Sequence, residues 1–331
     1  MRAAVIGGGA WGTALADLLA RNGHDVALWA RESDVVETVN SSHENLRFLK
    51  GFKLHESLRA SENMGSVLKG AELITYAAPS HVLRAVLKQE PKSVASDALL
   101  VVATKGIERD TLAIMTDVIH QELPGRSVVA LSGPSFAAEV AARQPTAVVA
   151  ASSDSSAAEA TQGAYSSKTF RVYTHDDVVG VELGGALKNV MAVATGVAEG
   201  LGLGYNSRAA LITRGLAEIV RLGSALGANP ATFAGLAGVG DLVLTCTGAL
   251  SRNRSVGIEI GEGKTLEEVL KSRETVAEGV NTTQSAHALA AREGVEMPIV
   301  DAVYRVLFRG FAARDAIGSL MRRELRSEQD R

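Results

Sequence analysis

Short apolar runs alternate with helical segments along the first half of the chain. Residues 3–7 form an apolar run that ends in glycines, and residues 25–31 form a second one. Between them, residues 13–23 have helical periodicity and end on a glycine. The later apolar runs of this kind cover residues 71–79, 98–106, 127–135 and 146–152. Such alternation predicts a doubly wound parallel sheet, an α/β fold.

The pattern changes after about residue 178, where strand signals end and long helical patterns follow. The expected helices cover residues 181–199, 207–226, 251–261, 265–272, 279–293 and 298–306. Residues 235–241 are glycine-rich but follow no strand, so we interpret them as an interhelical turn and not as a nucleotide site. We therefore predict an α/β domain over residues 1–178 and an all-helical domain over residues 179–331.

Composition narrows the class of protein. The chain has 331 residues, 46% hydrophobic and 21% charged, a balance typical of a soluble globular protein. Its net charge of −3 provides no basic excess for nucleic acid. A single cysteine, Cys246, excludes an intramolecular disulfide and fits a reducing compartment. We see neither a run of about 18 uncharged apolar residues nor a signal-peptide core, and expect a cytoplasmic protein that does not span a membrane.

A glycine motif follows the first apolar run. Gly7, Gly9 and Gly12 have the spacing G-x-G-x-x-G, between a predicted strand and a predicted helix. In a dinucleotide-binding turn, the first glycine allows the tight turn, the second lets a pyrophosphate approach, and the third lets the helix pack closely. A glycine turn that binds nothing is the alternative, but the strand and helix around the motif favour a dinucleotide.

The end of the second predicted strand indicates which dinucleotide is used. An acidic residue there binds the ribose 2′-hydroxyl of NAD, whereas an arginine accommodates the 2′-phosphate of NADP. Arg31 occupies this position and Glu32 follows it. We favour NADPH, with NADH left open because Glu32 is adjacent and Arg31 could be a solvated surface residue.

Polar residues follow the predicted strands where open α/β sheets bind ligands. Lys105 comes directly after one strand and could reach a phosphate, although an exposed turn lysine is the alternative. Gly133 and Ser135 follow another, and Ser135 is a candidate cap for the next helix.

In the helical half, Ser251 could cap a helix whose first turn contains Arg252, Asn253 and Arg254. Two guanidinium groups, an amide and free backbone N–H groups would make a phosphate receptor. A solvated basic turn is the alternative.

Lys188 lies in a long apolar helical pattern, which is unusual for a lysine. Apolar surroundings would lower its pKa from about 10.4, and such a lysine could protonate a developing alkoxide. Asp241 would be a natural partner if the fold brings the two together. A lysine that extends to the surface from a helix–helix seam is the alternative. Its helical neighbours are small, which would leave room for a ligand, and they are Gly184, Gly185, Ala192 and Thr195.

With these residues in place, the sequence resembles the bacterial NAD(P)-dependent glycerol-3-phosphate dehydrogenases. The resemblance extends from residue 5 to about residue 299. Its most specific part is the block over residues 211–254, and the other segments include "VIGGGAWGTALA", "ATKGI", "LSGPSFAAEVA" and "VELGGALKNVMAVATG". It implies a Rossmann domain followed by a helical domain like that of 6-phosphogluconate dehydrogenase, commonly in a homodimer. The implied reaction reduces dihydroxyacetone phosphate to sn-glycerol 3-phosphate, the backbone of phospholipids.

The resemblance also implies roles for residues, and it implies no metal. Lys188 would be the catalytic acid/base, Asp241 would support it, and Lys105 would contact substrate and cofactor. The remaining substrate contacts would be Gly133, Ser135, Ser251, Arg252 and Asn253. Cofactor contacts beyond the glycines would be Ala10, Trp11, Arg31, Ala137, Arg252, Val276 and Glu278.

One segment departs from the family pattern. Residues 45–58 contain no proline, where family members usually carry a Leu-Pro pair. This departure leaves open how rigid the loop near the adenosine end is.

Two other functions remain to be distinguished. A related β-hydroxyacid or sugar-acid dehydrogenase would share the two-domain plan, but Lys105 with the turn over residues 251–254 favours a phosphate over a carboxylate. A nucleotide-sensing binding protein would need only the cofactor half. The joint presence of Lys188, Asp241, Lys105 and Arg252 argues against it.

Overall fold

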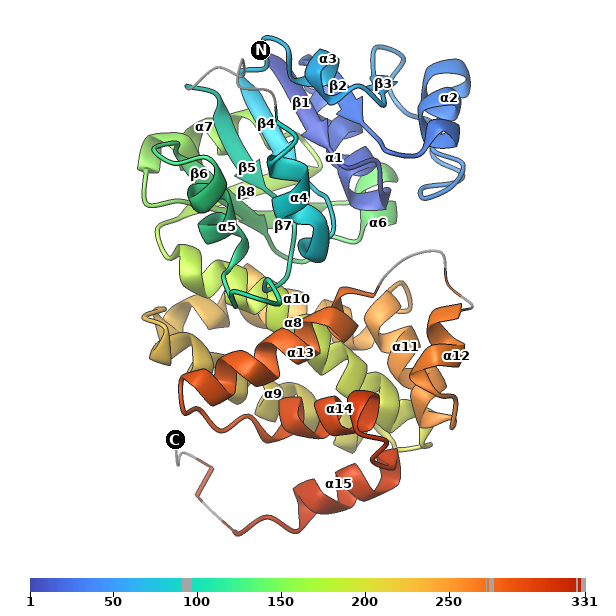
Figure 1. Cartoon of the computed structure of the whole chain (residues 1–331), viewed down its shortest axis with the longest axis vertical. Helices are drawn as coiled ribbons and strands as arrows, with labels where there is room; N and C mark the ends of the chain where they lie inside the picture. The colour runs from blue at the N-terminus through green and yellow to red at the C-terminus, as the bar shows by residue number, and fades with distance from the viewer. Residues whose placement is uncertain (91–96, 272, 274–276, 326, 329–331) are drawn as a thin grey trace. The chain divides into compact units, whose positions relative to one another are not determined.

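The computed structural model describes residues 1–90, 97–271, 273, 277–325 and 327–328 (Figure 1). The chain forms two compact units, which are described separately. The first unit contains Met1–Lys105 and Ile114–Val178. The second contains Val179–Arg331 together with the short segment Gly106–Ala113.

The first unit is built on an eight-stranded sheet with the order β3-β2-β1-β4-β5-β6-β7-β8. All neighbouring strands run parallel except β6 and β7. The strands are β1 (Arg2–Ile6), β2 (Asp25–Trp29), β3 (Arg59–Ser61), β4 (Leu73–Tyr76), β5 (Leu99–Val102), β6 (Val128–Ser132), β7 (Thr146–Ala151) and β8 (Phe170–His175). This sheet confirms the predicted α/β class.

The sheet also differs from the expectation in two respects. The predicted parallel arrangement is confirmed for the neighbouring strands except β6 and β7, which pair in the antiparallel direction. The pattern of apolar residues in a strand does not reveal the strand's direction, and the connection made by α6 (Ala137–Ala141) reverses the chain. Strands β3 and β8 were not predicted: β3 has three residues with one buried, and β8 alternates buried and exposed positions at its start.

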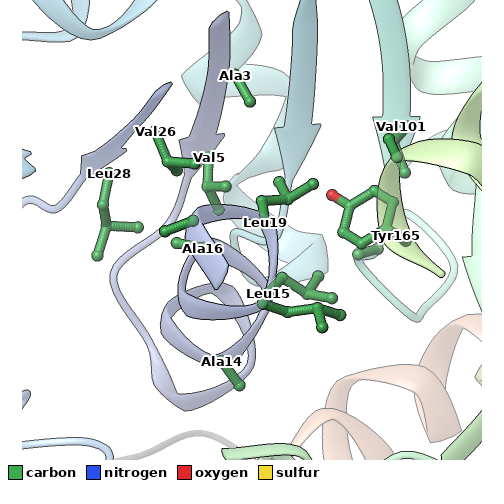
Figure 2. Packing of buried hydrophobic residues seen from close by; sticks show 14 of the residues in the cluster. Ala3, Val5, Ala14, Leu15, Ala16, Leu19, Val26, Leu28, Val101 and Tyr165 are labelled. Atoms are coloured by element: carbon green, nitrogen blue, oxygen red, sulfur yellow. The ribbon is translucent and has the colours of Figure 1, made fainter. Parts of the chain in front are cut away.

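Helix α1 (Ala10–Arg21) begins directly after the glycine turn, earlier than the predicted start at residue 13. Figure 2 shows Leu15 and Leu19 of this helix among sheet residues such as Val5, with the ring of Tyr165 beside them. The other helices of this unit, besides α6, are α2 (Ser33–Ser42), α3 (Met64–Leu68), the 3-10 turn η1 (Ser80–Val82), α4 (Leu83–Leu87), α5 (Met115–Glu122) and α7 (Ser155–Tyr165).

The second unit is helical, and its other helices surround α8 (Val178–Gly200) (Figure 1). Every residue of α8 from Gly180 to Ala198 is buried. Its other elements are α9 (Tyr205–Ala225), η2 (Pro230–Ala234), η3 (Leu236–Gly240), α10 (Asp241–Thr247), α11 (Arg252–Gly261), α12 (Leu266–Lys271), α13 (Glu278–Arg292), α14 (Pro298–Phe308) and α15 (Ala313–Met321). The long helices match the predicted ranges within a few residues, whereas α10 and α15 were not predicted.

Helix α8 is long and apolar enough to cross a membrane by length and composition alone. In the structure, 89% of its most apolar 18-residue stretch is buried inside the protein. The core helix of a globular protein passes the same test, so the helix is weak evidence for a membrane span.

Two helices of this unit touch backbone to backbone. A Cβ added to Gly196 of α8 would lie 2.1 Å from the carbonyl oxygen of Arg254, and one added to Gly257 of α11 would lie 2.2 Å from that of Val193. No side chain fits at such distances, so these glycines set the separation of α8 and α11. As a result, the first turn of α11 lies beside the second half of α8.

Candidate active site

The glycine turn between β1 and α1 has the shape expected for binding a diphosphate. Gly7 has a φ of +126°, and a Cβ there would lie 2.8 Å from the carbonyl carbon of Ala77. A Cβ on Gly12 would lie 1.9 Å from the carbonyl oxygen of Gly7, so only glycine lets the helix start this close to the turn. In contrast, a Cβ on Gly9 would meet nothing within 4 Å. The turn is therefore packed on its inner side and open at Gly9.

Polar groups at the start of α1 are consistent with a bound dinucleotide. Gly9 is the N-cap of α1, and no side chain caps the helix. The indole Nε1 of Trp11 is buried and has no hydrogen-bond partner among the residues that the structure describes. A buried donor without a partner is costly, and an acceptor on a ligand would relieve that cost. Ala10 is the first residue of the helix. These features fit the phosphates of NAD or NADP.

Arg31 follows β2 and is exposed, with 81% of its side chain accessible. One guanidinium nitrogen lies 3.1 Å from a carboxylate oxygen of Glu32. This exposed pair leaves the guanidinium accessible to a phosphate.

At the ends of β5 and β6, Lys105 and Ser135 converge on one carbonyl group. Lys105 Nζ donates to the carbonyl oxygen of Gly133 at 2.9 Å, and Ser135 Oγ donates to the same oxygen at 3.1 Å. The prediction that Ser135 caps the next helix is wrong. Phe136 is the N-cap of α6, and the Ser135 hydroxyl turns back to Gly133. Ala137 is the first residue of α6.

In the second unit, Lys188 and Asp241 form a buried ion pair. Lys188 Nζ donates to Asp241 Oδ1, and the two residues are 7% and 0% exposed. Such a pair persists in a core only when the charges compensate each other. Thr245 was missed by sequence reasoning; its Oγ1 lies 2.6 Å from the Asp241 carbonyl oxygen and 3.3 Å from Oδ1. Its only sequence signal is its position one helical turn after Asp241.

The small residues near Lys188 have a different role from the expected one. A Cβ on Gly184 would lie 2.4 Å from the carbonyl oxygen of Ala237. The face at Gly184 is therefore filled by the glycine-rich turn and is not open for a ligand. Because this turn leads directly into α10, its close packing on α8 places Asp241 beside Lys188.

Amide groups link three helices next to this pair. Asn253 Nδ2 donates to Asn189 Oδ1 at 2.8 Å, and the N–H of Gly279 donates to Asn253 Oδ1 at 2.9 Å. Asn189 and Asn253 are 5% and 8% exposed. Ser251 is the N-cap of α11 and accepts from the N–H of Arg254 at 3.2 Å, which confirms the predicted cap.

The two arginines of this turn behave differently. Arg254 Nε and Nη2 donate to Glu199 at 2.9 Å and 2.5 Å, so the expectation that Arg254 faces a phosphate is wrong. Arg252 is exposed and interacts electrostatically with Glu278, the first residue of α13. Val276, another expected cofactor contact, lies outside the described residues.

Within the described ranges, no three His, Cys, Asp or Glu side chains are grouped so that they could hold a metal ion. A Rossmann-type glycine turn in one unit and a buried lysine–carboxylate pair in a helical unit are features of oxidoreductases that depend on a dinucleotide, and this is the class of protein that the fold and the site indicate.

Comparison with known proteins identifies the family. Residues 2–158 match the family described as NAD-dependent glycerol-3-phosphate dehydrogenase N-terminus. Residues 177–318 match the family described as NAD-dependent glycerol-3-phosphate dehydrogenase C-terminus. Glycerol-3-phosphate dehydrogenase [NAD(P)+] of Syntrophotalea carbinolica is 54% identical over 333 residues, covering 100% of both chains. The enzyme of that name from Geobacter sp. strain M21 is 53% identical over 98% of both chains. The crystal structure of glycerol-3-phosphate dehydrogenase from Coxiella burnetii is 40% identical, with a TM-score of 0.94 over 97% of this chain and 99% of that one. The chain belongs to the NAD-dependent glycerol-3-phosphate dehydrogenase family.

Proposed function

We propose that this chain reduces dihydroxyacetone phosphate to sn-glycerol 3-phosphate, with NADPH favoured over NADH, and that the product serves phospholipid synthesis. The observation that carries the proposal is the buried Lys188–Asp241 pair. Full-length relatives with the name glycerol-3-phosphate dehydrogenase [NAD(P)+] support the choice of substrate. We also expect the protein to be cytoplasmic and to form a homodimer. Light scattering after size-exclusion chromatography would test the homodimer.

Lys188 is the proposed acid/base. When bound, the cofactor supplies a hydride to the substrate's carbonyl carbon. The ammonium group of Lys188 donates a proton to the carbonyl oxygen, so that the ketone becomes an alcohol and the lysine becomes neutral. Asp241 holds Nζ in place and compensates its positive charge before the transfer. In the reverse direction, neutral Lys188 accepts the proton of the alcohol.

Each unit, taken by itself, offers candidate residues for binding the substrate. In the second unit, the first turn of α11 offers backbone N–H groups at the positive end of a helix, together with the Arg252 guanidinium. Ser251 and Asn253 shape this turn through the cap and the amide link. In the first unit, Lys105 is the proposed cationic contact, with Gly133 and Ser135 as its supports.

The proposed cofactor contacts extend the glycine turn. Gly7, Gly9 and Gly12 bind the diphosphate, and Arg31 binds the 2′-phosphate of NADPH. The other proposed contacts are Ala10, Trp11, Lys105, Ala137, Arg252, Val276 and Glu278.

A steady-state assay of NADPH and NADH oxidation with dihydroxyacetone phosphate tests the activity. A β-hydroxyacid panel, assayed as oxidation, tests the related dehydrogenases. Lys188→Met removes the ammonium group and preserves much of the side-chain volume. We expect it to lower kcat at least about a thousandfold while NADPH still binds.

The matched control is Lys264→Met, which removes an exposed lysine paired with Glu259 at 2.8 Å. It should leave kcat within about twofold, because exposed ion pairs contribute little. Near-normal turnover in Lys188→Met would contradict the lysine assignment. NADPH binding by wild type without turnover on any substrate would favour a nucleotide sensor.

A further inference from the structure

One buried asparagine contacts the glycine turn from a distant loop. Asn45 is 0% exposed and lies in the proline-free segment after α2. Its Nδ2 donates to the carbonyl oxygen of Gly8 at 2.8 Å and to Thr13 Oγ1 at 2.9 Å. Thr13 Oγ1 in turn lies 3.3 Å from the same carbonyl oxygen. The Gly8 carbonyl is thus held from two sides inside the protein.

This contact determines the direction of a neighbouring donor. The C=O of Gly8 and the N–H of Gly9 belong to one peptide unit, and in a trans peptide they point in opposite directions. The chain has no cis peptide bond among its described residues. Since the Gly8 carbonyl points inward to Asn45 and Thr13, the Gly9 N–H points away from them. A Cβ on Gly9 would meet nothing within 4 Å, so the turn also leaves space beside Gly9.

The turn needs such a restraint because Gly7, Gly8 and Gly9 are consecutive. Glycine rotates about its backbone bonds more freely than any other residue. If the Gly8–Gly9 peptide flipped, a carbonyl oxygen would replace the N–H on the side away from Asn45. An oxygen repels a diphosphate, whereas an N–H binds it.

The loop that carries Asn45 is itself anchored. Asn45 Oδ1 accepts from the N–H of Phe48 at 2.9 Å. The N–H of His55 donates to the buried carboxylate of Asp17 on α1 at 2.6 Å, and Arg21 Nη2 donates to the carbonyl oxygen of Lys53 at 2.8 Å. The loop is therefore joined to both ends of α1. These hydrogen bonds restrain a loop that has no proline to stiffen its backbone.

We infer that Asn45 is a positioning residue for cofactor binding, which acts by orienting the Gly8–Gly9 peptide toward the diphosphate. The inference rests on the proposed function, in which the glycine turn binds the diphosphate of the cofactor. It predicts that Asn45 affects affinity for the cofactor and leaves the proton chemistry of Lys188 unchanged.

Asn45→Asp is the sharpest test because the two side chains have the same shape. The carboxylate still accepts from Phe48, but it donates nothing and repels the Gly8 carbonyl. We expect the Kd for NADPH, measured by fluorescence titration, to rise about tenfold or more. The KM for NADPH should rise in parallel, while kcat at saturating NADPH and the KM for dihydroxyacetone phosphate stay within about twofold.

Asn40 provides a matched control in the same unit. Its amide also makes two hydrogen bonds to backbone, both to Ala60 and both 2.9 Å long, but it does not touch the glycine turn. Asn40→Asp should leave the Kd for NADPH unchanged even if it lowers the melting temperature. A loss of stability alone would reduce the active fraction and would not change this Kd.

The outcomes separate the two hypotheses. If wild type binds neither NADPH nor NADH, the proposed function fails. The inference about Asn45 is wrong if wild type and Asn45→Asp bind NADPH with the same Kd. It is also wrong if Asn40→Asp raises the Kd for NADPH as much as Asn45→Asp does. If Asn45→Asp does not fold, Thr13→Val decides. It removes the second restraint on the Gly8 carbonyl and should raise the Kd about two- to fivefold; an unchanged Kd would overturn the inference.

Discussion

A buried carboxyl group gives the second unit a pH-dependent stability. Glu218 on α9 is 4% exposed, and its carboxylate accepts from the N–H groups of Ile299 at 2.8 Å and Val300 at 3.3 Å. These two residues belong to the first turn of α14, so Glu218 caps a helix whose bonded N–H groups lie 81 and 82 residues further along the chain. Burial raises the pKa of Glu218 from 4.5 to about 7, although the two N–H groups and the charges of Arg221 and Arg323 oppose the rise.

The direction of the effect follows from proton linkage. Because the pKa is higher in the folded state than in the unfolded state, the folded state binds more protons between pH 4.5 and about 7. The contribution of Glu218 is fully present below the unfolded pKa and is lost as the pH rises through the folded pKa. One pKa unit corresponds to about 1.4 kcal/mol, so this group lowers the free energy of unfolding by about 2.5 kcal/mol from pH 5 to pH 8.

The substitution Glu218→Gln tests this pH dependence of stability, because glutamine keeps a carbonyl acceptor for the α14 N–H groups but does not titrate. Urea unfolding at pH 5, 6, 7 and 8 would give the difference in free energy between wild type and variant. We expect that difference to change by about 2.5 kcal/mol over this range in favour of the variant at high pH. Glu267→Gln, at an exposed glutamate of α12, is the control. A difference for Glu218→Gln that stays constant with pH would refute the reasoning.

Two further predictions follow from packing and charge. Gly257→Ala should lower the free energy of unfolding by about 2 kcal/mol or more, measured by urea unfolding, because its Cβ would lie 2.2 Å from a carbonyl oxygen of α8. Gly163→Ala, in α7 with nothing within 4 Å of the added Cβ, should be neutral or stabilising, and equal losses for the two would contradict this account. Arg31→Asp should shift cofactor preference from NADPH to NADH, measured as the ratio of the two kcat/KM values. An unchanged ratio would mean that Arg31 is a surface residue without a role in cofactor choice.

Much of the fold could be predicted because long helices have a strong periodic signal. The helix expected over residues 279–293 is observed as Glu278–Arg292. Strand β3 gave no such signal, because it has three residues and pairs only with β2 among the described strands. The direction of β7 could not be predicted either, since apolar strands look the same in both directions.

Local chemistry made part of the site predictable as well. The glycine turn is recognisable because its residues are consecutive and lie between a strand and a helix. Asn45 gave no signal, because a lone asparagine in a polar loop is typical of any turn. Its role depends on a contact with Gly8 across 37 residues.

The sequence by itself determined the α/β and helical halves, the glycine turn and the set of polar residues that could do chemistry. These features depend on neighbours within a few residues along the chain. Only the tertiary structure decided which polar groups pair. It joins Lys188 to Asp241 across 53 residues, and it commits Arg254 to Glu199 instead of a phosphate. The physical reason is that burial makes an unpaired charge costly, and the partner that compensates it is chosen by packing between helices.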